Sequence, residues 1–260
     1  MSTLRVSLVQ TSLAWHDPAA NRAALERIVA PLANTTDLIV LPEMFTTGFT
    51  MAPREVAEAA EGATLEWLRE LACRLDSAVT GSVATRDDGR YLNRLLWVEP
   101  DGRAAHYDKR HLFRMAREHE HYTGGRRRLI VEWRGFRICP LVCYDLRFPV
   151  WSRNRRVAPY DVLVYVANWP AARRTAWQRL LPARAIENLC YVVGVNRVGS
   201  DAQGIAYAGD SAVHDWRGDA LVELGDAATV ASIALERDSL DRFREKFPAQ
   251  LDADDFELLD

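Results

Sequence analysis

Short apolar runs alternate with helical patterns along the first third of the chain. Residues 4–10 and 37–41 are apolar runs of strand length, and they predict two buried strands. Between them, Asp17-Pro18 predicts the start of a helix whose apolar positions are Leu25, Ile28, Val29 and Leu32. Residues 64–75, TLEWLRELACRL, repeat this helical spacing. Strands and helices are therefore expected in alternation.

The middle of the chain adds hairpins to this alternation. Extended runs surround the turns at 100–102 and 134–135, and residues 211–224 show a further hairpin pattern. Hairpins within an alternating α/β pattern imply a mixed sheet. The pattern therefore predicts one layered, mixed α/β domain with many strands.

A strand–helix–strand pattern follows in the second half. Residues 160–169 and 191–199 predict strands, and residues 174–190 predict a helix between them. Pro182 is expected to interrupt this helix, because proline lacks a backbone N–H and crowds the preceding turn.

Composition and charge favour one large globular domain. The chain has 260 residues, of which 48% are hydrophobic, so residues 1–260 are expected to form a single domain with an acidic surface tail from about residue 252. Its 33 basic and 36 acidic side chains give a formal net charge of −3, and no long basic stripe suggests a nucleic-acid partner. The cluster of arginines at 126–128 predicts a solvated loop.

Targeting and membrane signals are not seen. The N-terminal stretch lacks the pattern of a signal peptide, and no apolar run approaches the ~18 residues that a membrane span needs. The four cysteines have no C-x-x-C spacing, which favours reduced thiols in a cytoplasmic protein over disulfides or a zinc site. Cys73, Cys139 and Cys190 are expected to be packed.

Cys143 differs, because it stands where an apolar run breaks into charge. Two other runs also end in a chemically capable residue: LIVLPEMFTTGF carries Glu43 and HYDKRHLF carries Lys109. Reactive groups gather beyond the C-terminal ends of strands in an open α/β sheet, so Glu43 and Cys143 are expected to be neighbours. A buried carboxylate can accept the thiol proton, and a lysine can stabilise both a thiolate and an oxyanion. The three residues predict acyl transfer.

These motifs resemble those of the carbon-nitrogen hydrolase (nitrilase) superfamily. DLIVLPEMFTTGF, YDKRHLF and CYDLRFPVWSRN stand in the family's order and at its separations, and the resemblance covers nearly the whole chain. It implies a Glu43–Lys109–Cys143 triad on a single-domain, four-layer α-β-β-α sandwich with mixed sheets. It also implies a homodimer. The chemistry of this triad needs no organic cofactor and no metal.

The family has a second glutamate in the loop after the lysine, and RMAREHEHYTGG offers two. Glu118 is expected to orient Lys109 and the bound amide, because its distance from Lys109 and from the glycines at 124–125 matches the family's loop better. Glu120 is expected to be a solvated carboxylate.

The same segment also suggests a metal site. His119 and His121 would share one face of an extended chain, and imidazole with carboxylate suits transition metals, with Glu118, Glu120 and His111 as further ligands. No H-E-x-x-H motif or cysteine pair accompanies them. A network of hydrogen bonds is therefore favoured, and no metal is predicted.

Further pocket residues are inferred from the resemblance and from their position after strands. The backbone N–H of Tyr144 resembles the family's second oxyanion donor beside Lys109. VANWPAARR follows a strand, so Asn168 and Trp169 are expected to line the pocket, with a core role as the alternative for Trp169. Glu187 resembles a family position that supports the site without taking part in the chemistry.

Two arginines are candidates for binding a substrate carboxylate. Arg147 either binds it or forms an ion pair with Asp145 on the same turn. Arg173, at the end of VANWPAARR, is the second candidate. A small anionic substrate would need at least one such group.

The resemblance implies a mechanism and a substrate class. Glu43 would take the Cys143 proton, sulfur would attack an amide carbon, ammonia would leave, and water would hydrolyse the thioester. LPEMFTTGF, DKRHLFRMA and ANWP resemble the omega-amidase branch, which hydrolyses the terminal amide of 2-oxo acids such as 2-oxoglutaramate and 2-oxosuccinamate. The alternatives are an amidase of deaminated glutathione, an N-carbamoyl or ureido hydrolase, a nitrilase, and a catalytically silent interaction module.

Overall fold

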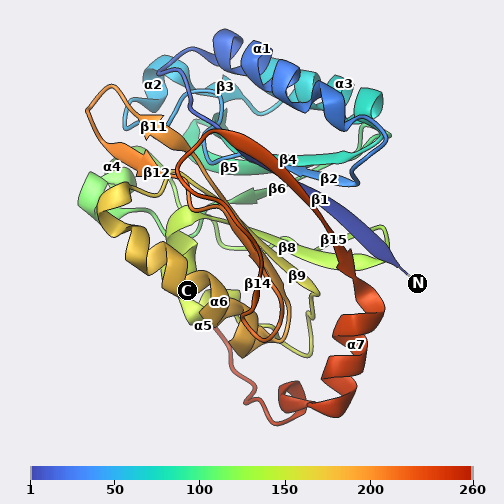
Figure 1. Cartoon of the computed structure of the whole chain (residues 1–260). Coiled ribbons are helices and arrows are strands. Elements are labelled where there is room, and N and C mark those ends of the chain that lie inside the picture. Colours follow the sequence, from blue (N-terminus) through green and yellow to red (C-terminus); the bar gives the residue numbers. More distant parts are fainter. Residues whose placement is uncertain (1, 259–260) are drawn as a thin grey trace.

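Two β-sheets lie face to face, and helices cover their outer faces (Figure 1). The computed structural model describes residues 2–258. The first sheet has the order β15-β1-β2-β4-β5-β6, with the short β3 paired to β4. Its strands are β1 (Thr3–Gln10), β2 (Leu38–Val40), β3 (Glu58–Ala59), β4 (Ala78–Asp87), β5 (Arg90–Val98), β6 (Ala104–Asp108) and β15 (Thr229–Glu236).

The second sheet has the order β14-β13-β10-β9-β8-β7. Its strands are β7 (Val131–Trp133), β8 (Phe136–Val142), β9 (Val162–Ala167), β10 (Tyr191–Asn196), β13 (Ala212–His214) and β14 (Ala220–Glu223). A separate two-stranded ribbon consists of β11 (Val198–Ser200) and β12 (Ala206–Ala208).

Helices form the two outer layers, and short helices connect the strands. Figure 1 shows α1 and α3 over the first sheet and α6 against the second. The α-helices are α1 (Pro18–Val29), α2 (Pro53–Val56), α3 (Ala63–Leu75), α4 (Glu118–His121), α5 (Pro149–Ser152), α6 (Arg174–Asn188) and α7 (Arg237–Lys246). The 3-10 helices are η1 (Ala30–Leu32), η2 (Arg114–Ala116), η3 (Cys143–Arg147), η4 (Ala171–Arg173) and η5 (Ala249–Leu251). The predicted α-β-β-α sandwich is confirmed.

Both sheets are mixed, as predicted. Strands β1, β2 and β4 pair in parallel, and so do β8, β9 and β10. The predicted hairpins are the antiparallel pairs β5–β6, β7–β8 and β13–β14. Apolar side chains such as Leu8, Leu141 and Val166 fill the space between the sheets, while Leu25 of α1 and Leu68 of α3 pack in a separate core on the outer face of the first sheet.

The strand ends position the candidate residues. Glu43 follows β2, Cys143 directly follows β8 and Asn168 directly follows β9, and these three strands belong to the parallel parts of the two sheets. Lys109 directly follows β6, at the edge of the first sheet. The two facing sheets therefore deliver four polar side chains to one end of the sandwich.

Two local predictions are wrong. Pro182 does not interrupt α6, which continues through it; the buried Trp177, Leu181 and Ala185 pack this helix onto the sheet, and that packing outweighs one lost backbone hydrogen bond. Cys73 lies on α3 but is exposed, because it is one position past the buried Ala72 and so faces away from the apolar stripe. The predicted burial of Cys139 and Cys190 is confirmed.

Among the longer elements, β4, β15 and α7 have no counterpart in the predictions. Residues 252–258 of the predicted acidic tail lie mostly on the surface, with Asp255 bound to Arg156 at 2.9 Å, and residues 259–260 lie outside the described residues. None of the helices between residues 2 and 258 combines the length and apolarity needed to cross a bilayer.

Candidate active site

Cys143 occupies a strained turn at the end of β8. Its φ is +45°, in the left-handed region that residues with a side chain rarely adopt. The turn continues into η3, and a 3-10 helix leaves the N–H groups of its first turn, including that of Tyr144, without an acceptor inside the helix. The geometry presents a thiol and a backbone N–H donor side by side at the sheet end.

Glu43, Lys109 and Glu118 form a cluster with no solvent exposure of their side chains. Lys109 Nζ donates to Glu43 Oε1 at 2.8 Å and to the two Glu118 oxygens at 3.0 and 3.1 Å. The structure thus brings together the predicted glutamates and lysine beside Cys143, which shares a cavity with Lys109.

The charges in this cluster control one another. Burial alone would lower the pKa of Lys109, but the carboxylates of Glu118 and Glu43 outweigh it and raise the pKa above its ordinary value. Burial raises the pKa of Glu118 and Lys109 opposes this, with a net rise. Burial also raises the pKa of the Cys143 thiol well above its ordinary value, Glu43 adds to the rise, and Lys109 opposes it. The resting sulfur is a thiol beside a carboxylate that can accept its proton.

Asn93 of β5 is a site residue that the sequence did not reveal. Its Nδ2 donates to Glu43 Oε1 at 2.8 Å and to Glu118 Oε1 at 3.2 Å, so one side-chain amide bridges both carboxylates. Its Oδ1 accepts from the Ser82 hydroxyl at 2.8 Å, which fixes the orientation of the amide. The available signal was weak: a polar residue within the extended run RYLNRLLWV.

The structure separates the two glutamates of the loop. Glu118 is buried and also accepts from the backbone N–H of Phe113. Glu120 is exposed and pairs with Arg117 at 2.7 Å. The segment 118–121 is a helix rather than an extended chain, so His119 and His121 do not share a face as assumed.

The histidines of this region do not gather at a metal site. His111 Nδ1 lies 2.8 Å from Asp145 Oδ1, away from His119, whose Nε2 lies 3.9 Å from Glu120 Oε1. Within residues 2–258 no group of three or more potential ligands is arranged to hold a metal ion.

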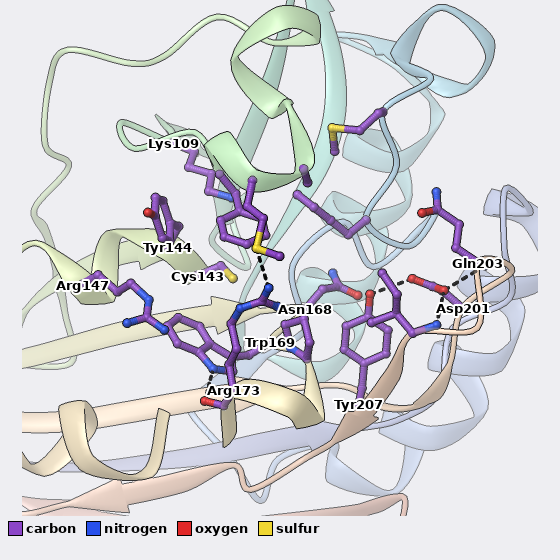
Figure 2. Close-up of a pocket in the computed structure, with 17 residues that line it drawn as sticks. Lys109, Cys143, Tyr144, Arg147, Asn168, Trp169, Arg173, Asp201, Gln203 and Tyr207 are labelled. Atoms are coloured by element: carbon purple, nitrogen blue, oxygen red, sulfur yellow. Dashed lines mark hydrogen bonds between the residues drawn. The ribbon is translucent and has the colours of Figure 1, made fainter. Parts of the chain in front are cut away.

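A cavity of about 290 Å³ opens above Cys143 (Figure 2). Besides Lys109 and Cys143, its lining includes five residues proposed from the sequence: Tyr144, Arg147, Asn168, Trp169 and Arg173. Phe49, Met51, Phe113 and Met115 give it an apolar wall. The volume is close to that of small-ligand pockets.

Asn168 connects this cavity to Glu43. Its backbone N–H donates to Glu43 Oε2 at 2.8 Å, and its side-chain amide donates to the Glu43 carbonyl. With the bond from Lys109, these contacts hold both oxygens of the Glu43 carboxylate.

Arg147 and Arg173 flank Trp169 in the cavity (Figure 2). The Arg147 guanidinium lies 5.0 Å from the Trp169 ring centre, and Trp169 Nε1 donates to the carbonyl of Arg173 at 2.9 Å. Arg173 Nη2 contacts Met115 Sδ at 2.6 Å. In the described chain neither guanidinium is paired with a carboxylate, and the ion pair considered between Arg147 and Asp145 is not formed. Trp169 is both 3% exposed and part of the cavity wall.

Glu187 lies behind the cavity rather than in it. It accepts from Arg184 at 2.9 Å, and Arg184 donates to the carbonyl of Leu146 in η3 at 2.8 Å. Among residues 2–258, Glu187 is therefore linked to the Cys143 turn through Arg184.

The ribbon β11–β12 supplies a wall that the sequence did not predict. Asp201, Gln203 and Tyr207 line the cavity opposite Arg147 (Figure 2), and Ile205 also belongs to the lining. Asp201 accepts from the Tyr207 hydroxyl at 2.8 Å and from two backbone N–H groups of its own loop, so it shapes this wall. Nothing in the residues 201–207 distinguishes them from an ordinary surface turn.

Comparison with known proteins gives a consistent result. The carbon-nitrogen hydrolase family model matches residues 5–245. The chain is 51% identical over 262 residues to an omega-amidase YafV from Yersinia enterocolitica, with 100% of each chain covered. It is 31% identical to a 2-oxoglutaramate amidase from Bacillus subtilis, with 94% of this chain and 95% of the relative covered.

A solved structure agrees with these matches. The crystal structure of XC1258 from Xanthomonas campestris, described as a CN-hydrolase superfamily protein, superposes with a TM-score of 0.97 at 51% identity, covering 99% of this chain and 100% of that one. The family model, the relatives and the fold agree, and the chain belongs to the carbon-nitrogen hydrolase family.

Proposed function

We propose that the protein is an omega-amidase that hydrolyses the terminal amide of a 2-oxo dicarboxylic acid monoamide, such as 2-oxoglutaramate or 2-oxosuccinamate. The observation that carries this proposal is a pair of guanidinium groups, Arg147 and Arg173, in the same cavity as Cys143 and without a carboxylate partner in the described chain. Relatives named omega-amidase and 2-oxoglutaramate amidase support the same substrate class.

The chemistry begins with a proton transfer from Cys143 to Glu43. The sulfur attacks the amide carbon, and Lys109 Nζ and the Tyr144 N–H stabilise the oxyanion. Glu43 then protonates the leaving nitrogen, so ammonia departs and a thioester remains. Water attacks the thioester with Glu43 again as base. Glu118 accepts from Lys109 Nζ through both of its oxygens, in addition to the bond to Glu43, and these bonds keep the ammonium in place through both steps.

The two arginines suit a 2-oxo acid. A carboxylate and the adjacent oxo group together offer three acceptor oxygens, and guanidinium groups bind such planar sets through paired N–H donors. Met115 is a weak acceptor for Arg173, so a substrate carboxylate would displace it readily. The apolar wall would contact the methylene groups of the substrate.

The test is ammonia release from 2-oxoglutaramate by the purified protein and by Cys143→Ala, with folding of both checked by circular dichroism. We expect activity in the parent and none above background in the variant. Parallel assays with a simple nitrile and an N-carbamoyl amino acid separate the alternatives. Turnover of the nitrile or carbamoyl compound alone would overturn the substrate assignment.

Arginine variants test recognition of the carboxylate. Arg147→Met and Arg173→Met should each raise KM for 2-oxoglutaramate by about tenfold or more, because a charge-assisted hydrogen bond contributes about 1.5–3 kcal/mol. Their activity on butyramide, which has no carboxylate, should change little. Arg127→Met is the control, since Arg127 is exposed and does not line this cavity in the described chain. Equal losses on both amides would argue against a carboxylate-binding role.

We further propose that the enzyme is a cytoplasmic homodimer. All four cysteines are free, which suits a reducing compartment. Val150 of α5 and Ile186 of α6 are each more than half exposed and offer apolar surface for a second copy. Sedimentation of the purified protein tests the dimer, and a monomer at micromolar concentration would exclude a stable one.

A further inference from the structure

A buried carboxylate outside the cavity joins the two chain segments that carry Lys109 and Cys143. Asp145 has no solvent exposure, and it is absent from the cavity lining among residues 2–258. Its Oδ2 accepts from the Tyr107 hydroxyl at 2.7 Å and from the Val142 N–H at 3.1 Å. Its Oδ1 accepts from the backbone N–H of His111 at 3.1 Å, and lies 2.8 Å from His111 Nδ1.

The positions of these partners are systematic. Tyr107 and His111 stand two residues before and two residues after Lys109, while Val142 directly precedes Cys143. The first segment leaves β6 in one sheet, and the second leaves β8 in the other. Asp145 therefore binds the chain before and after Lys109 and the residue before Cys143, and so connects the two sheets.

His111 contributes to this link in two separable ways. Because an ionised carboxylate only accepts hydrogen bonds, Nδ1 carries the proton and donates to Asp145. The imidazole ring also stacks on Phe148, with centres 3.8 Å apart and planes 6° apart. The hydrogen bond belongs to the link, by which we mean the contacts of Asp145 with the segments around Lys109 and Cys143. The stacking is packing that any flat ring would provide.

We propose that Asp145 is a positioning residue, assisted by His111, which fixes the Lys109 ammonium relative to the Cys143 sulfur. The inference rests on the proposed function, because it assigns both groups to the reaction. The oxyanion forms between Lys109 Nζ, carried by one sheet, and the Cys143 sulfur, carried by the other. A shift of either group by ~1 Å can lower the rate roughly 100-fold. A fully satisfied buried carboxylate is a rigid connector of this kind.

Two substitutions of His111 separate positioning from packing. His111→Asn retains an N–H donor at the place of Nδ1 and loses the ring, whereas His111→Phe retains the ring and loses the donor. We expect kcat to remain within about threefold of the parent in His111→Asn and to fall by about tenfold in His111→Phe, the equivalent of one charge-assisted hydrogen bond. KM should be unchanged in both, since His111 does not line the cavity in the described chain. The melting temperature should be lower in His111→Asn than in His111→Phe, because only the second keeps the ring that stacks on Phe148.

Asp145→Asn and Asp161→Asn form a matched pair. Both aspartates are fully buried and multiply hydrogen-bonded, but Asp161 lies at the other end of β8 and β9, beside Arg137. Asp145→Asn places an amide NH₂ against N–H donors on one side of the link, and we expect kcat to fall by about 100-fold. Asp161→Asn should leave kcat within about twofold, although it destabilises the fold. Both are assayed below their unfolding temperatures.

A second reaction keeps the result separate from the choice of substrate. The variants are acylated with p-nitrophenyl acetate, an activated ester that needs the thiol and its oxyanion donors but no bound carboxylate, with Cys143→Ala as the blank. A parent that is acylated but does not release ammonia from 2-oxoglutaramate would overturn the substrate proposal alone, and the acylation rates would still test the link.

The outcomes are unambiguous. Positioning is supported if the rate of ammonia release or acylation is higher in His111→Asn, which keeps the donor, while the melting temperature is higher in His111→Phe, which keeps the ring. Positioning is overturned if both rates rank the variants in the same order as their melting temperatures. It is also overturned if Asp161→Asn loses as much activity as Asp145→Asn. A parent that the ester does not acylate at Cys143 would overturn both the function and the link.

Discussion

Two glutamates that are two residues apart differ completely in burial and in contact with Lys109. Glu118 and Glu120 occupy the same short helix, yet the first is fully buried on Lys109 and the second faces solvent beside Arg117. The spacing to Lys109 was enough to predict this choice, because only one of the two positions lies at the distance that the family's loop requires. The prediction that Glu118 takes part in the reaction follows from this geometry.

Replacing each glutamate separately tests that role. In Glu118→Gln, Lys109 would retain Glu43 as its anionic partner, so the Glu43 carboxylate would become a weaker base for the thiol. We expect kcat for ammonia release to fall by about 100-fold, at the lower end of the range for a lost proton-transfer function. Glu120→Gln should remain within about twofold. Equal activities of the two variants would contradict the assignment.

Other residues of the site were beyond prediction from the sequence. Asn93 and Tyr207 lie in strands, and neither stands in a motif. Their importance comes from contacts across long sequence separations, such as the bond from Asn93 to Glu43. A motif encodes what a residue type can do, whereas a contact of this kind exists only after folding.

At the scale of elements, α7 shows why some helices escape prediction. Leu240 is its only fully buried residue in the described range, so the apolar periodicity that signals a helix is nearly lost. The helix is held instead by charge: Arg237 and Arg244 donate to Asp161 at 2.6 and 2.7 Å, and Arg137 of β8 completes the cluster at 3.0 Å. The hairpins, by contrast, were predictable because glycine turns and flanking apolar runs are local signals.

This cluster predicts a loss of stability in acid. Burial alone would raise the pKa of Asp161, but its hydrogen bonds to Arg137 and Arg244 outweigh burial and lower the pKa below the ordinary value. A lowered pKa in the folded state means that the contribution to stability is complete above the unfolded pKa of ~3.9 and is lost as the pH falls through the folded value.

Denaturant unfolding of the parent and of Asp161→Asn between pH 7 and pH 3 measures this contribution. At pH 7 we expect the variant to be less stable by about 3–5 kcal/mol, because three arginines lose their buried partner. The difference should begin to shrink at about pH 4, because the Asp161 carboxylate of the unfolded parent starts to bind a proton there, before that of the folded parent. A difference that stayed constant across this range would show that the Asp161 charge is not the cause.

At the scale of the whole molecule, periodicity predicted mixed α/β layers but not their number. Strand patterns do not reveal which strands share a sheet: β1 and β15 lie more than 200 residues apart in the sequence and pair along their full length. The four layers came from resemblance to a family. The site at one end of the sandwich was predictable in part, because chemically capable residues follow strands that run in parallel.

The left-handed backbone of Cys143 limits which residues can replace it during evolution. Glycine would adopt a φ of +45° without strain, so it is the residue that the turn itself favours. It would also remove the sulfur. Selection for stability alone would therefore drive this position towards glycine, while selection for turnover retains the cysteine, and the two pressures oppose each other at a single torsion angle.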